Sequence, residues 1–439
     1  MMPEFAILGS GMAGFGAVHA LGAEGIRPTV YDMKPYHGGH TASHRFDEGF
    51  VLDEGPHISF TKNERIKQLF AESVKHEYEE SLAHVNNYWK GHWIDHPAQC
   101  HLYGLPEDLV ARIIRDFVEA ERTDTVPIEN YEQWLRAAFG DTFAETFPMQ
   151  YTQKYHTTCA ANLTTDWVGQ RVYRPNIEEV LRGAQSPTRE NVHYITQFRY
   201  PSRGGYVSYL DAFLQQADVA LSHRLTSLDP VAKTLRFANG VVASYDEVIS
   251  SIPLPELIPL IDNAPRDVRE AAARLACTEA VVVSVGVNRP DPHNAHWTYF
   301  YDDDIFFTRL STPHLQSRNN VPAGCACLMA ECYFSDKYRP LDRSPDDCID
   351  PVIRDLERVG ILREGEDVIF RKAMRLKYAN IIFDLERAPA LEVVHGFLDD
   401  IGVRYCGRYG LWAYIWTDQA FLSGEKAAER ALRNTRSLV

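Results

Sequence analysis

Long apolar runs, paired cysteines and an excess of positive charge are all missing from this sequence of 439 residues. No apolar stretch approaches the ~20 residues that span a bilayer, and no basic start with an apolar segment precedes the first strand, so we expect neither a membrane span nor a signal peptide. The net charge of −15 argues against nucleic acid or an anionic membrane as the main partner. The eight cysteines include no CxxC pair, which is typical of reduced thiols in a cytoplasmic protein.

A metal site and a repeat architecture are not indicated either. His37, His40, His44 and His57 lie close together in the sequence, but no carboxylate or thiol completes a tetrahedral set at helix spacing, and we predict no metal. No internal repeat or low-complexity segment stands out. With 45% hydrophobic and 24% charged residues, the composition is that of a globular protein, long enough for two domains or one large discontinuous domain.

The stretch FAILGSGMAGFGAVHAL, near the beginning, contains four glycines in an otherwise apolar segment. Phe5–Leu8 is an apolar run typical of a buried strand, and residues 17–21 are typical of a helix. Gly9, Gly11 and Gly14 follow the G-x-G-x-x-G spacing, which allows a tight turn, the approach of a pyrophosphate to the backbone, and close helix–strand packing. The helix start then offers N–H groups and the positive end of its dipole to the anion. A glycine-rich turn with a purely structural role is the alternative.

A second strand and a second glycine pair extend this pattern. The segment IRPTVYD is predicted to be a strand that ends at Asp32, 23 positions after Gly9, where a ribose-binding carboxylate is expected. A nicotinamide-binding domain would continue with a helix, whereas here Gly38, Gly39 and a turn-rich segment up to His57 follow. A second glycine-rich loop suits a longer dinucleotide, so the sequence predicts FAD.

The C-terminal segment supports the same cofactor. Val403–Cys406 is predicted to be a short strand, followed by a Gly-Arg turn and by a helix from about Thr417. A helix start aimed at the pyrimidine edge of a flavin would stabilise the negative charge of its reduced form. A terminal helix that only docks on the domain is the alternative.

Together these motifs resemble the flavin amine oxidase superfamily, which includes protoporphyrinogen oxidase-like proteins and UDP-galactopyranose mutase. The matching segments extend from the N-terminal glycine loop through GGHTASH, DEGPHISF, YPSRGGYVSYLDAF and YDEVISSIPLPEL to the terminal Gly-Arg motif. The resemblance implies noncovalent FAD in a two-lobed α/β, FAD-binding Rossmann-like (GR2-type) fold with a mixed-sheet plus helical substrate domain. The FAD contacts that it implies are Gly9, Gly11, Met12, Ala13, Gly14, Asp32, Gly38, Gly39, His40, His57, Leu225, Gly407, Arg408, Trp416 and Thr417.

The two domains are expected to interleave along the chain. The FAD-binding domain is predicted to be discontinuous, built from residues 1–75, 200–262 and 395–439. The substrate domain is predicted to comprise residues 76–199 and 263–394. Within it, EAVVVSVGV and CACLMAECYF are continuous apolar runs that predict central strands of a second sheet.

The middle of the chain resembles the mutase branch most. Its segment YEQWLRAAFGDTFAETFPMQYTQKYHTTCAANLTTDWVGQRVYRP is interpreted as a helix, Tyr-Thr-x-Lys, a polar turn and a helix that ends in arginine. GRYGLWAYIW is similar to the mutase signature Gly-Arg-x-x-x-Tyr-x-Tyr-x-Asp, with Arg408, Trp412 and Tyr414 at the arginine and the two aromatic positions. The chain departs from this branch at Trp416, which replaces the Asp, and at His156, which replaces the aromatic residue that stacks on uracil.

The resemblance also implies candidate reactive residues. It places His57 against the flavin and Arg309 on a substrate diphosphate, and with Tyr414 these are the candidate catalytic residues. Guanidinium groups bind diphosphates and carboxylates through two parallel hydrogen bonds, so arginines at the active site of an acidic protein favour an anionic substrate. The candidate substrate contacts are Tyr151, Tyr155, His156, Arg171, Arg174, Arg309, Tyr378, Trp412 and Tyr414. For the lysine that holds a water near the flavin in many amine oxidases, only Lys372 and Lys377 are candidates.

Three functions remain open at this point. The first, which we favour, is an FAD-dependent oxidoreductase acting on a small anionic, nucleotide-linked, sugar-like substrate, with an amine oxidase-like activity as its variant. The second is a redox-neutral mutase in which reduced FAD attacks a sugar carbon and expels a nucleotide. The third is a non-catalytic binding protein on the same scaffold, as in the GDP-dissociation inhibitors. We expect a cytoplasmic protein with a small-molecule substrate, and a homodimer is one possible assembly.

Overall fold

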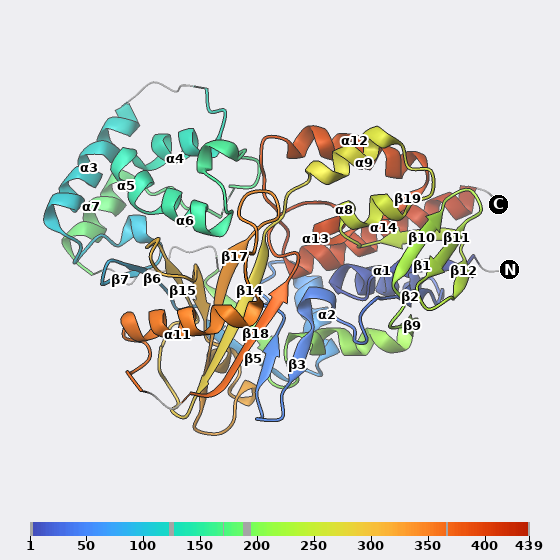
Figure 1. Ribbon diagram of the computed structural model, residues 1–439, viewed down its shortest axis with the longest axis horizontal. Coiled ribbons are helices and arrows are strands. Elements are labelled where there is room, and N and C mark those ends of the chain that lie inside the picture. Colours follow the sequence, from blue (N-terminus) through green and yellow to red (C-terminus); the bar gives the residue numbers. More distant parts are fainter. Residues whose placement is uncertain (1–2, 123–126, 170, 188–194, 366–367, 438–439) are drawn as a thin grey trace.

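The computed structural model describes residues 3–122, 127–169, 171–187, 195–365 and 368–437. The molecule is elongated, with a parallel sheet at one end, a larger mixed sheet in the middle and a layer of helices at the other end (Figure 1). The first and the last described residues both lie at the end with the parallel sheet. The predicted α/β class with a mixed second sheet is confirmed.

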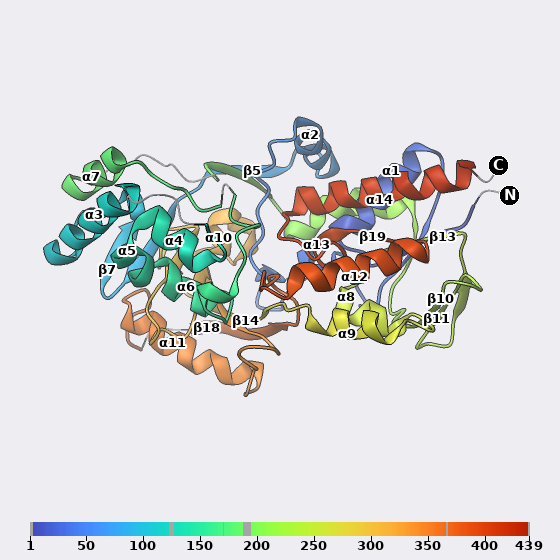
Figure 2. The same cartoon turned by 90° about the horizontal axis from the view of Figure 1, so that it is seen from above.

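The parallel sheet contains the glycine-rich turn and is covered on both faces. Its strand order is β19-β13-β1-β2-β9, and every neighbouring pair is parallel. Phe5 and Ile7 belong to the buried cluster that includes α1 and α14, and Ala6 and Leu8 belong to the one that includes α9 and α12. Figure 2 shows these two pairs of helices on opposite sides of the sheet. The bounds are β1 Phe5–Leu8, β2 Thr29–Tyr31, β9 Asp218–Ala220, β13 Glu247–Ser250, β19 Val403–Tyr405, α1 Met12–Ala23, α9 Arg266–Arg274, α12 Arg387–Asp400 and α14 Thr417–Ser437. The predicted strand Phe5–Leu8 and the helix start at Thr417 are therefore confirmed.

The mixed sheet has seven strands in the order β18-β14-β17-β16-β15-β6-β7. The two apolar runs form β14 and β17, which pair with each other inside the sheet and are buried at every residue, as predicted for central strands. Continuous burial explains why neither strand shows the alternation of a half-exposed strand. The bounds are β6 Val85–Trp89, β7 His92–Asp95, β14 Glu279–Val287, β15 Trp297–Phe300, β16 Arg309–Ser311, β17 Ala326–Phe334 and β18 Val368–Leu376.

Helices at the far end pack against this sheet. Tyr-Thr-x-Lys lies within α6 rather than after a helix. The predicted helix that ends in arginine is not present in the described residues, because residues 165–169 form a bend and turns, and residue 170 lies outside the described residues. There Leu163 bridges Asp384 and the Thr164 amide donates to the Phe383 carbonyl (2.8 Å), an extended pairing that a helix cannot keep. The bounds are α3 Glu107–Arg122, α4 Tyr131–Phe139, α5 Asp141–Thr146, α6 Pro148–Tyr155 and α7 Ile177–Gln185.

Smaller elements connect these layers. They are β3 Ser43–Arg45, β4 Val51–Asp53, α2 Glu64–Ser73, β5 Tyr78–Leu82, β8 Gln197–Pro201, β10 Leu225–Asp229, β11 Thr234–Phe237, β12 Val242–Ser244, α8 Leu254–Leu257, α10 Pro313–Gln316, α11 Ile349–Arg358 and α13 Gly407–Gly410. Among the described residues, no helix has both the length and the apolar character that crossing a bilayer requires.

The strands of the two sheets come from the ranges predicted for the two domains, but the helices cross those limits. The limit at residue 395 falls inside α12, and α9, which was assigned to the substrate domain, packs on α12 beneath the parallel sheet. The exact division into domains stays a prediction.

Helices α1 and α14 approach each other at backbone distance. A Cβ atom on Gly424 would lie 1.8 Å from the Ala13 carbonyl oxygen, and one on Gly16 would lie 2.0 Å from the Phe421 carbonyl oxygen. Only glycine, which has no Cβ atom, therefore fits at both positions. The contact sets the start of α14 beside the start of α1, at the glycine-rich turn.

The same contact predicts a stability difference between two helical glycines. Gly424→Ala forces the helices apart and should lower the free energy of unfolding by about 1–3 kcal/mol. Gly396→Ala, in α12, meets no atom within 4 Å and should be neutral or stabilising by about 0.5–1 kcal/mol, because alanine favours helices. Urea unfolding of both variants measures this, and equal stabilities would contradict the proposed contact.

Candidate active site

A cavity of about 740 Å³ is lined by residues of both sheets and of the loops between them. Its size falls within the range of ligand pockets, roughly 300–1,000 Å³. Of the fifteen residues predicted to contact FAD, fourteen line this cavity, and the exception is Gly14. The lining carries six cationic side chains (Lys34, Arg224, Arg309, Arg375, Lys377 and Arg408) and four carboxylates (Asp32, Glu54, Glu256 and Glu331), in a protein with a net charge of −15.

The three glycines of the first turn are needed for different reasons. Gly9 has φ +109°, and a Cβ on Gly14 would lie 2.0 Å from the Gly9 carbonyl oxygen, so the protein's own packing requires both. A Cβ on Gly11 would meet nothing closer than 3.6 Å, so the polypeptide alone does not require glycine there. Gly11 faces the cavity at the start of α1, where no side chain caps the helix. Open space beside uncapped N–H groups fits a pyrophosphate.

Asp32 is held in place at the end of β2. Its carboxylate accepts hydrogen bonds from the Ser10 amide (2.8 Å), the Ser10 hydroxyl (2.7 Å) and the Lys34 amide (2.9 Å). The side chain is thereby tied to the first glycine turn while it lines the cavity. This position fits the ribose-binding role that the sequence predicts.

A buried ionic cluster beside the second glycine pair was missed by the sequence analysis. Glu54 accepts hydrogen bonds from Lys34 (2.6 Å) and Tyr36 (2.7 Å) and lies 3.2 Å from the His44 ring. Burial alone would raise the pKa of Glu54, but these partners lower it to about 2. All four side chains line the cavity. The cluster holds β4 against the loop that carries Gly38.

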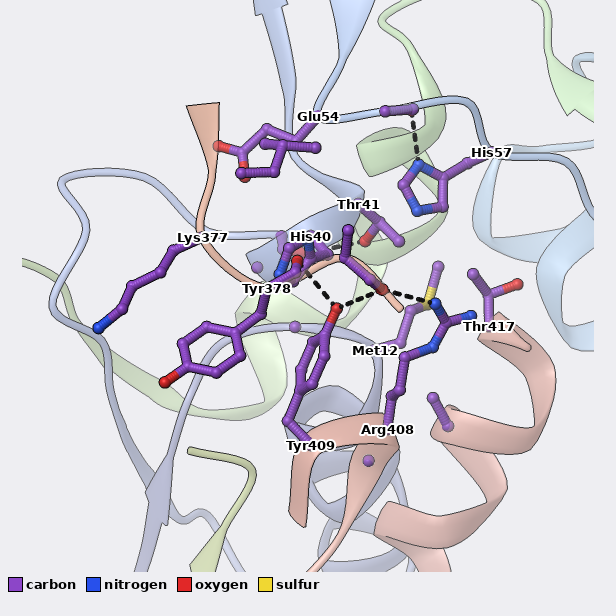
Figure 3. Close-up of a pocket in the computed structure, with 18 of the residues that line it drawn as sticks. Met12, His40, Thr41, Glu54, His57, Lys377, Tyr378, Arg408, Tyr409 and Thr417 are labelled. Carbon is purple, nitrogen blue, oxygen red and sulfur yellow. Dashed lines mark hydrogen bonds between the residues drawn. The ribbon is translucent and has the colours of Figure 1, made fainter. Parts of the chain in front are cut away.

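Two histidines of the cavity are kept neutral. Burial lowers the pKa of His57 to about 4, and burial together with the Lys34 charge lowers the pKa of His40 to about 3. His57 Nδ1 lies 2.9 Å from the Gly55 carbonyl oxygen (Figure 3), so Nδ1–H donates there and Nε2 is left as an acceptor. His57 can therefore accept a hydrogen bond in the cavity without carrying charge.

Arg408 lines the cavity, and its guanidinium is hydrogen-bonded to backbone carbonyls of the cavity wall. Its guanidinium donates to the Ala379 carbonyl through Nη1 (3.1 Å) and to the Ile415 carbonyl through Nη2 (2.7 Å) and Nε (3.1 Å). Figure 3 shows the bond to the Ala379 carbonyl. Together the three bonds fasten the segment before α14 to the chain after β18. Arg408 shapes the cavity wall through the backbone.

Arg309 lies in the wall that the mixed sheet provides. In the paired strands it is opposite Tyr299 of β15 and Glu331 of β17. Its Nε and Nη2 both donate to the Glu331 carboxylate, and no described residue accepts a hydrogen bond from Nη1. Burial alone would lower the pKa of Arg309, but Glu331 keeps it above its ordinary value. Glu331 therefore already occupies one side of the guanidinium group that was predicted to bind an anion.

A tyrosine hydroxyl contacts this guanidinium, because Nη2 of Arg309 also donates to the Tyr333 hydroxyl (3.4 Å). The Tyr333 hydroxyl donates to Glu331 (2.9 Å), and the Tyr155 and Tyr414 hydroxyls lie 3.1 Å apart. Of the predicted substrate contacts, Tyr155, Arg309, Tyr378 and Tyr414 line the cavity.

The other predicted substrate contacts lie outside the cavity lining. Trp412 is fully buried beside Tyr378 and Tyr409, and His156 is buried beside Trp167. Tyr151 stacks behind Tyr155 at a centroid distance of 5.3 Å. Two arginines complete the set. Arg171 lies over the Tyr414 and Trp416 rings, and Arg174 donates to the Ala137 carbonyl (3.2 Å) at an exposed position.

The fold and this cavity define a flavin-dependent enzyme, and comparison with known proteins agrees. The chain belongs to the flavin-containing amine oxidoreductase family, which it matches over residues 12–432. FAD is thus the cofactor, and the non-catalytic hypothesis is not supported. Among the described residues, no group of histidine, cysteine, aspartate and glutamate side chains is arranged to hold a metal ion.

Three solved structures illustrate the similarity. A reduced UDP-galactopyranose mutase has 26% sequence identity and a TM-score of 0.92, over 99% of this chain and 94% of that one. A putative protoporphyrinogen oxidase from Exiguobacterium sp. 255-15 has 16% identity and a TM-score of 0.76, over 99% of both chains. Cyclohexylamine oxidase from Brevibacterium oxydans IH-35A has 12% identity and a TM-score of 0.69, again over 99% of both.

The contrast between Gly11 and Gly14 predicts two different defects. Gly11→Val places carbon atoms where the pyrophosphate must approach and should weaken FAD binding roughly 10- to 150-fold, with a folded apoprotein. Gly14→Ala should destabilise the apoprotein itself. Flavin content after purification and thermal unfolding of the apoproteins separate the two effects. A Gly11→Val variant that binds FAD as tightly as the parent would disprove the placement of the pyrophosphate at Gly11.

Proposed function

We propose that this FAD-dependent enzyme acts on a small anionic substrate, a sugar-like group carried on a nucleotide diphosphate, and rearranges it without net oxidation while FAD is reduced. The observation that carries the proposal is the guanidinium of Arg309 in the cavity wall, held by Glu331 and in contact with the Tyr333 hydroxyl. Glu331 fixes its orientation through two hydrogen bonds, and Nη1 remains for a ligand. A fixed guanidinium with neighbouring hydroxyl donors suits a diphosphate.

The charge of the cavity supports an anionic ligand. Cationic side chains outnumber carboxylates in the lining, although acidic residues outnumber basic ones in the whole chain. The Tyr155 and Tyr414 hydroxyls, which also line the cavity, are hydrogen-bonded to each other (3.1 Å), so one O–H remains to donate to a ligand. A neutral O–H donor suits an oxygen of a diphosphate.

The similarity to a reduced UDP-galactopyranose mutase over nearly the whole chain supports the redox-neutral reaction. Bound FAD in its reduced state supplies an electron pair for such chemistry. Neutral His57 would accept a hydrogen bond from a sugar hydroxyl through Nε2, while Arg309 and the tyrosines hold the diphosphate. The protein side chains thus orient the substrate.

Amine oxidation is the second candidate, and family membership favours it. The lysine that an amine oxidase is expected to place near the flavin is less well supported in this chain. Lys377 donates to Glu256, and Lys372 is exposed on β18 and absent from the cavity lining. The homodimer, the cytoplasmic location and the identity of the sugar stay predictions.

Titration with UDP, followed by flavin absorbance, tests the anionic substrate. Arg309→Ala should weaken UDP binding roughly 10- to 150-fold, because one charge-assisted hydrogen bond is lost and Glu331 is left facing the ligand. Arg309→Lys should recover only part of this affinity, since lysine keeps the charge but lacks the planar group that donates two parallel hydrogen bonds.

Arg266→Ala is the matched control, because it removes the same charge from an exposed position outside the cavity and should bind UDP like the parent. Parent-like affinity in Arg309→Ala would end the proposal for a nucleotide-linked anion and return the choice to an amine.

A further inference from the structure

The Tyr-Thr-x-Lys motif ends in a buried lysine that the proposed function does not use. Lys154 lies in α6, next to Tyr155 in the sequence, and only 5% of its surface is exposed. Its Nζ donates to the Asp302 carbonyl (2.6 Å) and to the Ile305 carbonyl (3.0 Å). Burying an ammonium group removes its hydration, so a lysine at this position needs such partners. Lys154 therefore connects α6 to the turn that contains Asp302 and Ile305.

That turn lies between two neighbouring strands of the cavity wall. It follows β15, which carries Tyr299, and it precedes β16, which begins at Arg309. Tyr299 and Arg309 are opposite each other in the paired strands, and both side chains line the cavity. The backbone that Lys154 holds is thus four residues before Arg309 at its nearest point, the Ile305 carbonyl.

Helix α6 brings Tyr155 to the same part of the cavity. Tyr155 lines the cavity, and its hydroxyl lies 3.1 Å from the Tyr414 hydroxyl. The ring centroid of Tyr155 lies 4.8 Å from that of Tyr333, whose hydroxyl accepts a hydrogen bond from Arg309 (3.4 Å). Tyr155 from α6 and Arg309 from β16 therefore both contact Tyr333, and Lys154 joins the two elements that carry them.

We propose that Lys154 is a positioning residue for the diphosphate site: by joining α6 to the turn before β16, it sets the Tyr155 hydroxyl relative to the Arg309 guanidinium. This inference rests on the proposed function, because it assumes that Arg309 and the tyrosine pair hold a diphosphate. Lys154 itself is not among the residues that line the cavity, so it acts through these side chains.

The surroundings of Lys154 make this role dependent on pH. The groups whose charges act on its ammonium include the Asp302 and Asp303 carboxylates of the turn, Asp355 of α11 and the Cys332 thiol of β17. These groups favour the charged lysine, but burial has the larger effect and lowers the pKa of Lys154 to about 8. Lys154 is therefore charged below this pH and neutral above it. A neutral amine donates weaker hydrogen bonds than an ammonium, so the attachment of the turn should weaken as the pH rises through about 8.

Side chains around Arg309 do not share this titration. Burial raises the pKa of Tyr155 and the pKa of Tyr333 well above their ordinary value, and burial lowers the pKa of His57 to about 4. A change of anion affinity around pH 8 would therefore report on Lys154 rather than on these groups.

The test is a titration of the FAD-loaded enzyme with UDP-galactose, followed by flavin absorbance, at a series of pH values from about 6.5 to 9. The phosphates of this diester carry no proton that titrates in this range. The parent should bind UDP-galactose about 3- to 30-fold more weakly at the upper end than at neutral pH. Lys154→Met should be weakened by a similar factor at every pH. Lys154→Arg keeps its charge throughout and should bind without the pH step.

Lys233→Met is the matched control, because Lys233 also donates to a backbone carbonyl, that of Asp246 (2.7 Å), at an exposed position outside the cavity. It should keep the affinity and the pH profile of the parent. A lysine needed only for folding would lower the thermal unfolding temperature when replaced, but the parent would show no pH step.

The possible failures are distinct. A parent affinity that stays constant over this pH range, or a Lys154→Met variant that binds UDP-galactose like the parent, would overturn the positioning role while the proposed function stands. Absence of any flavin response to UDP-galactose in the parent at every pH would overturn the proposed function and the positioning role with it.

Discussion

The backbone contact between α1 and α14 is the constraint on which the site depends. Gly16 and Gly424 allow the two helices to touch, although they come from opposite ends of the chain. As a result the starts of both helices face one cavity, where the positive ends of their dipoles suit an anionic cofactor. The first glycine turn and the terminal Gly-Arg segment therefore act as one binding element, and a change in helix packing would alter both.

The cavity uses buried ion pairs to fix the orientation of its side chains. Glu331 holds Arg309, and Glu54 holds Lys34. Such pairs contribute little net stability, because removing both charges from water costs about as much as their attraction returns. Their effect here is geometric: they leave Nη1 of Arg309 for a ligand and tie the second glycine pair to β4. Because the side chains of the site come from two separate sheets, such ion pairs are needed to hold them in a fixed geometry.

The local features of the fold were predictable because short sequence patterns determine them. Residues close together in the sequence determine these features: the strand Phe5–Leu8, the glycine turn with Asp32 after it, and the buried strands β14 and β17. Contacts between distant segments were not predictable. Glu54 gains its partners only when β4 meets the loop after β2, and the segment before Arg171 forms turns because Leu163 pairs with Asp384. Trp412 matches an aromatic position of the signature, yet packing beside Tyr378 and Tyr409 buries it entirely.

The proposed function requires that one cavity binds both reduced FAD and a nucleotide-linked sugar, and that the reaction leaves the oxidation state of the flavin unchanged. The direct measurement is anaerobic: nucleotide sugars are added to oxidised and to dithionite-reduced enzyme, and the flavin spectrum and the products are followed. We expect an isomeric product only with reduced enzyme, and a flavin spectrum that is still that of the reduced state after turnover. Bleaching of oxidised flavin by the sugar, with formation of an oxidised product, would contradict the claim.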